Sequence, residues 1–330
     1  MKIAFYKDTF ANNRGADIAV KNLAAGLVER GHRVTLFTKP EFDEKVKGDY
    51  DVILSAGTNE IQDLANVPNL PPVVQQFHTD VTYPFRHPLK RWLRHLRIKK
   101  ALKFATRIQV LVSAHMTKLQ RLLRGVTAQD ISVIGNWSTF EAHSENEQGL
   151  ASQKVILYPG ALNKDKNQAL LVKAFAKVAK EFPEWQVHIY GKGKDRDVQA
   201  LKHLIARYNL SERVLLKGYA DLARPYAECA FVAFPSKTEG FPLTIIDAAM
   251  FSKPTVMIHD WIGCGVVTTE KAFATSLRKL MAEEDYRTKL GAEAKAYCLS
   301  HYSREKILSL WEEALTKALN GTPINTHGNS

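Results

Sequence analysis

Residues 231–260 constrain the fold of this chain more than any other stretch. An apolar run at 231–234 is too short for a helix and predicts a buried strand. Gly240 and Pro242 then interrupt the periodicity, and Pro242 suits the first position of a helix over residues 243–251. Because that helix is apolar almost all round, we expect it to be buried.

Two carboxylates stand in this apolar stretch, Glu239 in the loop and Asp247 in the predicted helix. A buried carboxylate needs hydrogen-bond donors or a cation, since burying the charge unpaired is costly. The residues alone leave two interpretations open: Asp247 pairs with a core Lys or Arg while Glu239 is solvated, or both acids face a ligand. The free backbone N–H groups of the loop and helix start favour an anion such as phosphate.

The length and composition predict two domains in one chain. With 330 residues, 45% of them hydrophobic, the chain suggests two domains of about 150 residues each. Neither a signal peptide nor an apolar run of about 20 residues is evident, so we expect a cytoplasmic protein, soluble or peripheral to the membrane. The three cysteines are far apart and form no C-x-x-C, which favours a reducing compartment and argues against structural zinc. We expect no bound metal.

The N-terminal half alternates predicted strands and helices in the order of a doubly wound domain. The expected strands are residues 2–6, 33–38, 52–55, 73–76, 108–112 and 131–134, with helices over 18–30 and 113–124. Gly15 lies in the loop after the first strand and allows a ligand to approach the backbone closely. His78 follows the fourth strand, where open α/β sheets bind ligands, although a single His is more often structural than catalytic.

The net charge of +12 is localised. Residues 81–129 contain twelve Lys and Arg and no Asp or Glu, and a helical pattern begins at Leu89. A solvated helix face usually mixes signs, and no nucleic-acid-binding motif accompanies the charge, so we expect no nucleic acid partner. Cations interleaved with aromatic and aliphatic residues favour an anionic membrane surface. The residues assigned to it are Arg86, Lys90, Arg91, Arg94, Arg97, Lys99, Lys100 and Lys103.

The C-terminal half repeats the alternation of strands and helices. Predicted strands cover residues 155–158, 186–190 and 214–216, and helices cover 168–181, 197–208, 271–301 and 304–319. Residues 141–153 are polar and unpatterned and are placed as the linker. The domains are therefore expected at 1–140 and 154–303, with a disordered tail at 320–330.

Several of these sequence motifs together resemble the signature of family 4 glycosyltransferases. These are retaining enzymes of the GT-B fold that use nucleotide-sugar donors. The resemblance rests chiefly on P-S-x-x-E-G-F-P from Pro235, an acid eight positions after Glu239, and a Lys-Pro before a short strand. It implies two Rossmann-like domains facing across a cleft, with residues 304–319 crossing back to the first. It also implies catalytic roles for Glu239 and His78. The implied donor-binding residues are Gly15, Lys166, Gly218, Gly240, Phe241, Pro242, Leu243 and Asp247.

The chain departs from the family pattern at several positions. Arg14 replaces one glycine of the first loop, Ala161 replaces an Arg that grips the donor diphosphate, and Asp247 stands where Glu is usual. The resemblance implies transfer of a sugar to a glycan or glycolipid acceptor, and the basic segment suggests a lipid-linked cell-surface glycan such as lipopolysaccharide core at the inner face of the cytoplasmic membrane. The departures motivate the rival hypothesis of a non-catalytic membrane or polyanion adaptor.

Overall fold

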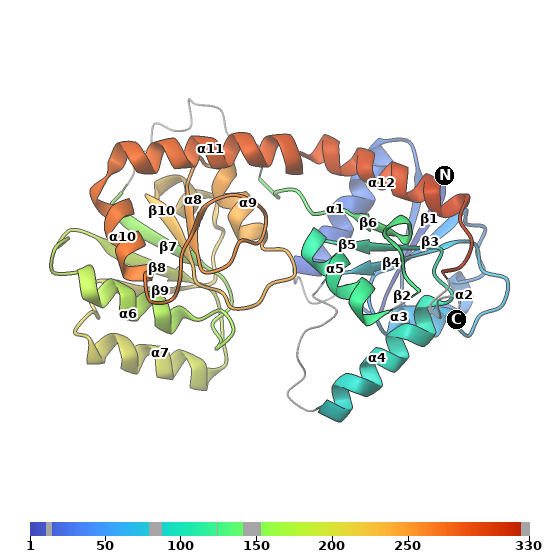
Figure 1. The fold of residues 1–330 in the computed structure, drawn as a ribbon, viewed down its shortest axis with the longest axis horizontal. Coiled ribbons are helices and arrows are strands. Elements are labelled where there is room, and N and C mark those ends of the chain that lie inside the picture. Colours follow the sequence, from blue (N-terminus) through green and yellow to red (C-terminus); the bar gives the residue numbers. More distant parts are fainter. Residues whose placement is uncertain (11–14, 79–87, 124, 141–152, 325–330) are drawn as a thin grey trace. The chain divides into compact units, whose positions relative to one another are not determined.

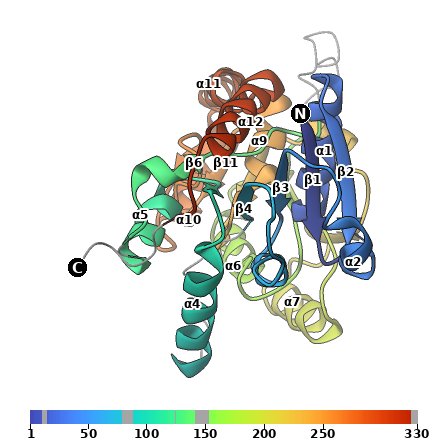
Figure 2. The same ribbon diagram turned by 90° about the vertical axis from the view of Figure 1, so that its right-hand side faces the viewer.

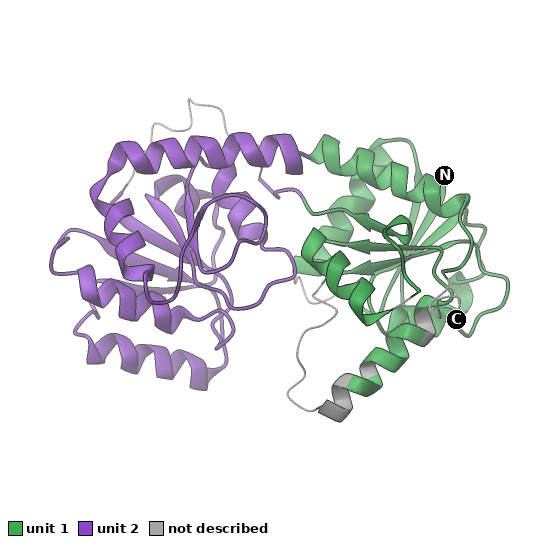
Figure 3. Cartoon of the chain, viewed as in Figure 1, with its two compact units in different colours: residues 1–136, 304–330 green, residues 137–303 purple. Residues whose placement is uncertain are grey.

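Two parallel sheets, one in each half of the chain, organise the computed structural model of this protein (Figure 1). The structure describes residues 1–10, 15–78, 88–123, 125–140 and 153–324. Unit 1 contains residues 1–136 and 304–330, and unit 2 contains residues 137–303 (Figure 3). Helices cover both faces of each sheet, so each unit is a doubly wound α/β domain.

The sheet of unit 1 has the strand order β2-β1-β3-β4-β5-β6, all parallel. Its strands are β1 (Lys2–Lys7), β2 (Arg33–Thr38), β3 (Val52–Ser55), β4 (Val73–Phe77), β5 (Arg107–Val110) and β6 (Ile131–Val133). Strand β2 lies on one side of β1, and β3 and the later strands lie on its other side. The strand order therefore reverses between β1 and β3, and their carboxyl ends mark the ligand-binding edge of this unit.

The helices of unit 1 are α1 (Gly15–Glu29), α2 (Phe42–Lys45), α3 (Glu60–Leu64), α4 (Pro88–Leu102), α5 (Ser113–Leu122) and α12 (Arg304–Leu319), with short 3-10 turns at Lys39–Glu41 and Ala128–Asp130. Helix α12 packs against α1 and strands β3 to β5. Gly26 of α1 permits this contact, because a Cβ there would lie 2.7 Å from Leu308 Cδ2. On the opposite face, Ile98 and Leu102 of α4 join the core that contains Tyr6.

The segment after α12 differs from the expected disordered tail. Ile324 is buried in the core of unit 1, and its N–H donates to the carbonyl of Ala105 at 2.9 Å. The N–H of Gly321 also donates to Ala318 O at 3.2 Å, so the segment is held against unit 1 as far as residue 324. The disorder prediction is wrong for residues 320–324, and residues 325–330 lie outside the described part of the chain.

The sheet of unit 2 has the strand order β12-β11-β10-β7-β8-β9, also parallel. Its strands are β7 (Val155–Pro159), β8 (Gln186–Tyr190), β9 (Val214–Gly218), β10 (Phe231–Phe234), β11 (Thr255–Met257) and β12 (Val266–Val267). Its helices are α6 (Gln168–Val178), α7 (Asp195–Arg207), α8 (Ala223–Glu228), α9 (Leu243–Met250), α10 (Phe273–Ala282) and α11 (Glu284–Tyr302). The strand order reverses between β7 and β10.

Helices α6 and α10 pack against each other over one face of this sheet, and α9 and α11 pack against each other over the other. Gly291 lets α11 approach the end of α9, because a Cβ at this position would lie 1.9 Å from the carbonyl oxygen of Ser252. The backbones of these two helices are therefore in direct contact, and α9 is held firmly between its strand and α11.

Candidate functional site

The carboxyl ends of β7 and β10 form the ligand-binding edge of unit 2, because the strand order reverses there. Glycines end the neighbouring strands: the N–H of Gly160 donates to Tyr190 O at 2.9 Å, and the N–H of Gly191 donates to Gly218 O at 2.6 Å. A Cβ on Gly191 would lie 1.9 Å from Gly160 O. We call Gly160, Gly191 and Gly218 the glycine ledge. The first two are half-buried and Gly218 is exposed, and without Cβ atoms their backbone allows a ligand to approach closely.

An ion pair joins the loops that follow β7 and β10. Lys166 Nζ donates to Glu239 Oε1, and the two side chains are 24% and 10% exposed. The N–H of Lys237 also donates to Asp165 O at 2.8 Å, while Asn163 Oδ1 accepts from the N–H of Lys166 at 3.0 Å and fixes the turn. The structure thus brings together two residues predicted as donor-binding and catalytic.

Two aromatic side chains lie near this ion pair. Lys166 Nζ lies 5.8 Å from the centre of the Phe234 ring at the end of β10. Burial, and secondly the charge of Glu239, raise the pKa of Tyr158 well above its usual value, so its hydroxyl stays protonated. Tyr158 accepts a hydrogen bond from Gln168 Nε2 at 2.9 Å. A charge-assisted contact in such a setting is stronger than in water.

Helix α9 begins at this edge, as the sequence predicts, but Pro242 is its N-cap and not its first helical residue. No side chain caps the helix, whose first residue is Leu243. The Ile245 N–H donates to Pro242 O at 3.1 Å, so the N–H groups of Leu243 and Thr244 are the ones left for a ligand. Gly240 lies in the loop just before it, and Phe241 packs edge-on against Tyr302 at 5.4 Å between ring centroids. Free N–H groups at the start of a helix suit an anion.

Asp247 is half-buried on α9 and binds no cation among the described residues. Its Oδ1 accepts a hydrogen bond from Ser138 Oγ at 2.6 Å, and the Thr139 N–H is a second donor. Burial raises its pKa to about 6, with the two hydrogen bonds opposing the shift. The alternative in which Asp247 pairs with a core Lys or Arg is therefore wrong.

Gly218 is the last residue of β9 and has φ 72°, and a Cβ added to it would have no atom within 4 Å. The backbone conformation, and not a lack of space, requires glycine here. Gly218 belongs to the same glycine ledge as Gly160 and Gly191, so its predicted donor-binding role is compatible with its place.

His78 directly follows β4 in unit 1, and its Nε2 is buried without a hydrogen-bond partner among the described residues. Burial and, secondly, the Lys7 ammonium lower its pKa to about 4, while Asp17 opposes the shift. Lys7 Nζ lies 2.8 Å from Asp17 Oδ1. His78 is therefore a neutral imidazole at pH 7.

Gly15 differs from its expected place in a loop, because α1 begins at this residue and not at residue 18. Its preceding neighbours, 11–14, lie outside the described residues. The sequence reasoning also missed Lys7 and Asp17 as the ion pair beside His78. Their positions could have indicated this pair: Lys7 is the last residue of β1, and Asp17 lies in the first turn of the helix that follows.

Helix α4 lies within the basic segment and extends away from the sheet of unit 1 (Figure 2). Ile98 and Leu102 are buried, whereas Trp92, Leu93 and Leu96 are 56%, 40% and 45% exposed. Of the eight predicted membrane-binding cations, Arg97, Lys99 and Lys103 have described side chains, and the first and last of these are exposed. The other five, Arg86, Lys90, Arg91, Arg94 and Lys100, lie outside the described side chains.

Neither a metal cluster nor a membrane span occurs in the described residues. No group of three or more His, Cys, Asp or Glu within them could hold a metal ion. None of their helices is long and apolar enough to cross a membrane.

Comparison with known proteins identifies a family for one region of the chain. Residues 140–297 match the model of the family described as "Glycosyl transferases group 1". This match covers nearly all of unit 2, including Lys166, Glu239 and Asp247. Residues 140–297 belong to the group 1 glycosyltransferases. The fold agrees: HepE from Anabaena, solved in complex with UDP-glucose, is 21% identical and covers 96% of this chain and 99% of its own, with a TM-score of 0.78. The GT-B fold is therefore confirmed.

Two curated relatives are similar to part of this chain. One is the N-acetylgalactosamine-N,N'-diacetylbacillosaminyl-diphospho-undecaprenol 4-alpha-N-acetylgalactosaminyltransferase of Campylobacter jejuni, 34% identical over 134 residues, which are 40% of this chain and 32% of the relative. The other is the lipopolysaccharide 1,6-galactosyltransferase of Salmonella typhimurium, 27% identical over 144 residues, 42% of this chain and 39% of the relative. The chain spans less than half the length of these relatives.

Proposed function

We propose that this protein is a retaining glycosyltransferase that moves a sugar from a nucleotide-sugar donor to a lipid-linked acceptor of a cell-surface glycan, such as lipopolysaccharide core. The observation that carries the proposal is the Lys166–Glu239 ion pair at the edge between β7 and β10. A pair of opposite charges at a backbone ledge offers a cation for a diphosphate and a carboxylate for a developing positive charge.

The diphosphate of the donor would lie over the ledge and compete with Glu239 for Lys166. The N–H groups at the start of α9 would bind its oxygens, since helix N-termini favour anions. Asp247 would hold the ribose by exchanging its hydrogen bond from Ser138 for one from a ribose hydroxyl. The base would lie toward Gly218, where the ledge ends at β9.

Once the diphosphate takes Lys166, Glu239 is left as a free carboxylate beside the sugar. Its charge would then stabilise the oxocarbenium character that develops as the bond to the diphosphate breaks. In retaining transfer on one face of the sugar, the leaving diphosphate would accept the proton of the acceptor hydroxyl. His78 is the candidate catalytic residue of unit 1, and we expect no metal because Lys166 and helix N–H groups supply the positive charge.

The acceptor is inferred from α4 and from the relatives. Exposed Trp92, Leu93 and Leu96 beside exposed cations match the interface of an anionic bilayer. The relatives named for undecaprenol-linked and lipopolysaccharide substrates act on lipid-borne glycans. A peripheral position at the inner face of the cytoplasmic membrane would place the enzyme beside such an acceptor.

Transfer of a radiolabelled sugar tests the proposal. The protein is incubated with labelled UDP-, GDP- or ADP-sugars and a bacterial lipid extract, and label in the lipid phase is counted. We expect one donor to give label that depends on Glu239. Binding of a donor with no transfer to any lipid or glycan acceptor would instead support the non-catalytic adaptor, which the loss of the usual cation at Ala161 favours.

A further inference from the structure

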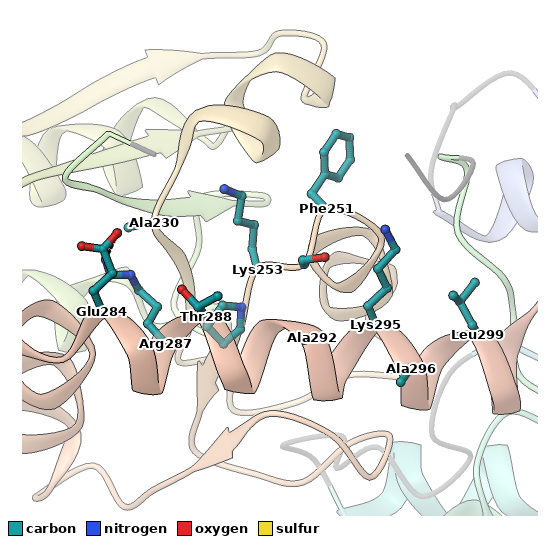
Figure 4. Close-up of a pocket in the computed structure, with 12 residues that line it drawn as sticks. Ala230, Phe251, Lys253, Glu284, Arg287, Thr288, Ala292, Lys295, Ala296 and Leu299 are labelled. Atoms are coloured by element: carbon teal, nitrogen blue, oxygen red, sulfur yellow. Dashed lines mark ion pairs between the residues drawn. The ribbon is translucent and has the colours of Figure 1, made fainter. Parts of the chain in front are cut away.

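A second hollow lies at the opposite edge of the unit 2 sheet from the glycine ledge. It has a volume of about 490 Å³ and is lined by the residues that precede β10 and β11, the end of α9 and one face of α11 (Figure 4). Ala230 and Pro254 stand just before their strands, so the hollow opens at the amino ends of the strands. No group assigned to the donor lines it.

The walls of this cavity are well fixed. Ser252 adopts φ 55°, and the N–H of Lys253 donates to Ala248 O at 2.9 Å, closing the last turn of α9. Ala230 is tied to β7 by a hydrogen bond from its N–H to Val155 O at 2.9 Å. Gly291 brings α11 into backbone contact with Ser252. The cavity is therefore built into the fold and is not a gap between mobile loops.

Three cations and one carboxylate stand among the described residues that line the cavity. The cations are Lys253, Arg287 and Lys295, and the carboxylate is Glu284. The Glu284 side chain is 78% exposed and 3.8 Å from Arg287, so solvent screens its charge. Arg287 is 8% exposed and donates to Leu280 O at 2.6 Å. The described lining residues therefore carry a net positive charge.

The ammonium group of Lys253 has no counter-charge among the described residues. Lys253 is half-buried, and no ion pair or hydrogen bond involves its ammonium in the described part of the chain. Burial, with a further contribution from Arg287, lowers its pKa, which is the response of a cation that lacks a counter-charge. An anion in the cavity would supply the missing charge.

The shape of the cavity limits the ligand. Lys253 and Lys295 project to the same side of α11, with Phe251 above the stretch between them (Figure 4). Ala292, Ala296 and Leu299 form an apolar strip along α11. A doubly charged group with a short carbon portion would satisfy both features, since a dianion matches two ammonium groups better than a carboxylate does.

We propose that this cavity binds a phosphate monoester at a site separate from the glycine ledge. The ligand is either a small soluble phosphate ester or the phosphate headgroup of a lipid. Lys253 and Lys295 would bind the phosphate, Thr288 would donate to it, and the carbon portion would lie on the apolar strip of α11. The proposal does not depend on the glycosyltransferase activity.

Calorimetric titration of the full chain with glycerol 3-phosphate tests the site, with glycerol as the uncharged control. We expect Lys253→Gln and Lys295→Gln each to weaken binding at least tenfold, and Lys253→Arg to restore most of it. Lys202→Gln, an exposed lysine of α7 in the same unit, should bind as the wild type does. Circular dichroism confirms that each variant is folded.

Glycerol 3-phosphate could instead bind at the glycine ledge, and Lys166→Ala distinguishes the two sites. Glycerol 3-phosphate binding that survives Lys166→Ala supports the cavity, whereas binding lost with Lys166→Ala and retained in Lys253→Gln overturns it. In a parallel arm, Lys253-dependent binding to phosphatidic acid vesicles without binding of the soluble ester would support the site and identify a lipid headgroup as the source. No Lys253-dependent binding in either arm overturns the proposal.

Discussion

Lys166 and Glu239 neutralise each other in the structure, so a change at one residue alters the charge available at the other. A donor diphosphate needs the ammonium, and the reacting sugar needs the carboxylate. We therefore expect substitution of Lys166 to weaken donor binding and substitution of Glu239 to lower the rate of transfer.

The Glu239→Gln variant should retain donor binding and lose turnover. Without the carboxylate, Lys166 is free for the diphosphate, so the donor dissociation constant should be unchanged or smaller. The rate constant for transfer should fall on the order of 100-fold or more, because a charge that acts in the transition state is lost. Single-turnover kinetics and calorimetry measure the two effects. Turnover within a few-fold of the wild type, at equal melting temperature, would remove Glu239 from the site.

Asp247 should make stability depend on pH. Its folded-state pKa of about 6 lies above the ordinary value of 3.8, so the stability that this proton confers is fully present below about pH 4 and is lost as the pH rises through 6. Asp247→Asn removes this dependence. The stability of the Asn variant relative to the wild type should rise by about 1 kcal/mol between pH 5 and pH 8. Denaturant unfolding of both proteins measures this. The same stability difference between variant and wild type at pH 5 and pH 8 would contradict the raised pKa.

At the scale of elements, the contact between α9 and α11 depends on one glycine. Gly291→Ala would place a Cβ 1.9 Å from Ser252 O, and relieving that overlap should cost about 1–3 kcal/mol. Gly15→Ala is the matched control, since a Cβ there would have nothing within 4 Å and alanine favours a helix. Urea denaturation should show a loss only for Gly291→Ala. Equal stability of both variants would mean that α11 does not approach α9 so closely.

Helix α4 should bring the protein to anionic bilayers. We expect co-sedimentation with phosphatidylglycerol vesicles at low salt, little binding to neutral vesicles, and loss at high salt, since salt screens such attraction. Substituting Arg91, Arg94, Lys99 and Lys100 by Gln should weaken binding at least tenfold. The control variant removes the same amount of positive charge from unit 2 by substituting the exposed Lys173, Lys177, Lys202 and Arg207. It should weaken vesicle binding less. If both variants bind equally well, net charge and not α4 is responsible.

Most elements could be predicted from local patterns, because apolar runs and glycine or proline stops are local. The predicted bounds of β2, β3, β8 and α12 agree with the structure. The short helices α3 and α8 were missed, since five or six residues are too few to show helical periodicity. Pro242 was misplaced by one position because its extended ψ of 94° makes it a cap.

At the scale of the whole molecule, the fold could be predicted but the contacts of the site could not. Lys166 and Glu239 are 73 residues apart, and their meeting depends on β10 pairing with β7 although β8 and β9 lie between them in the chain. Ser138, which donates to Asp247, lies 109 residues earlier, beside a segment with no pattern of its own. Long-range pairing of this kind depends on strand order, which local sequence does not specify.

The central claim is that the edge between β7 and β10 binds a nucleotide-sugar through Lys166. The most direct test is the calorimetric dissociation constant of the donor selected by a thermal-shift screen of UDP-, GDP- and ADP-sugars. For Lys166→Ala we predict binding weakened at least tenfold, with Lys202→Ala unchanged, because removing a charge-assisted contact to phosphate costs about 1.5–3 kcal/mol. An unchanged dissociation constant in Lys166→Ala, or no binding of any nucleotide-sugar to the wild type, would contradict the claim.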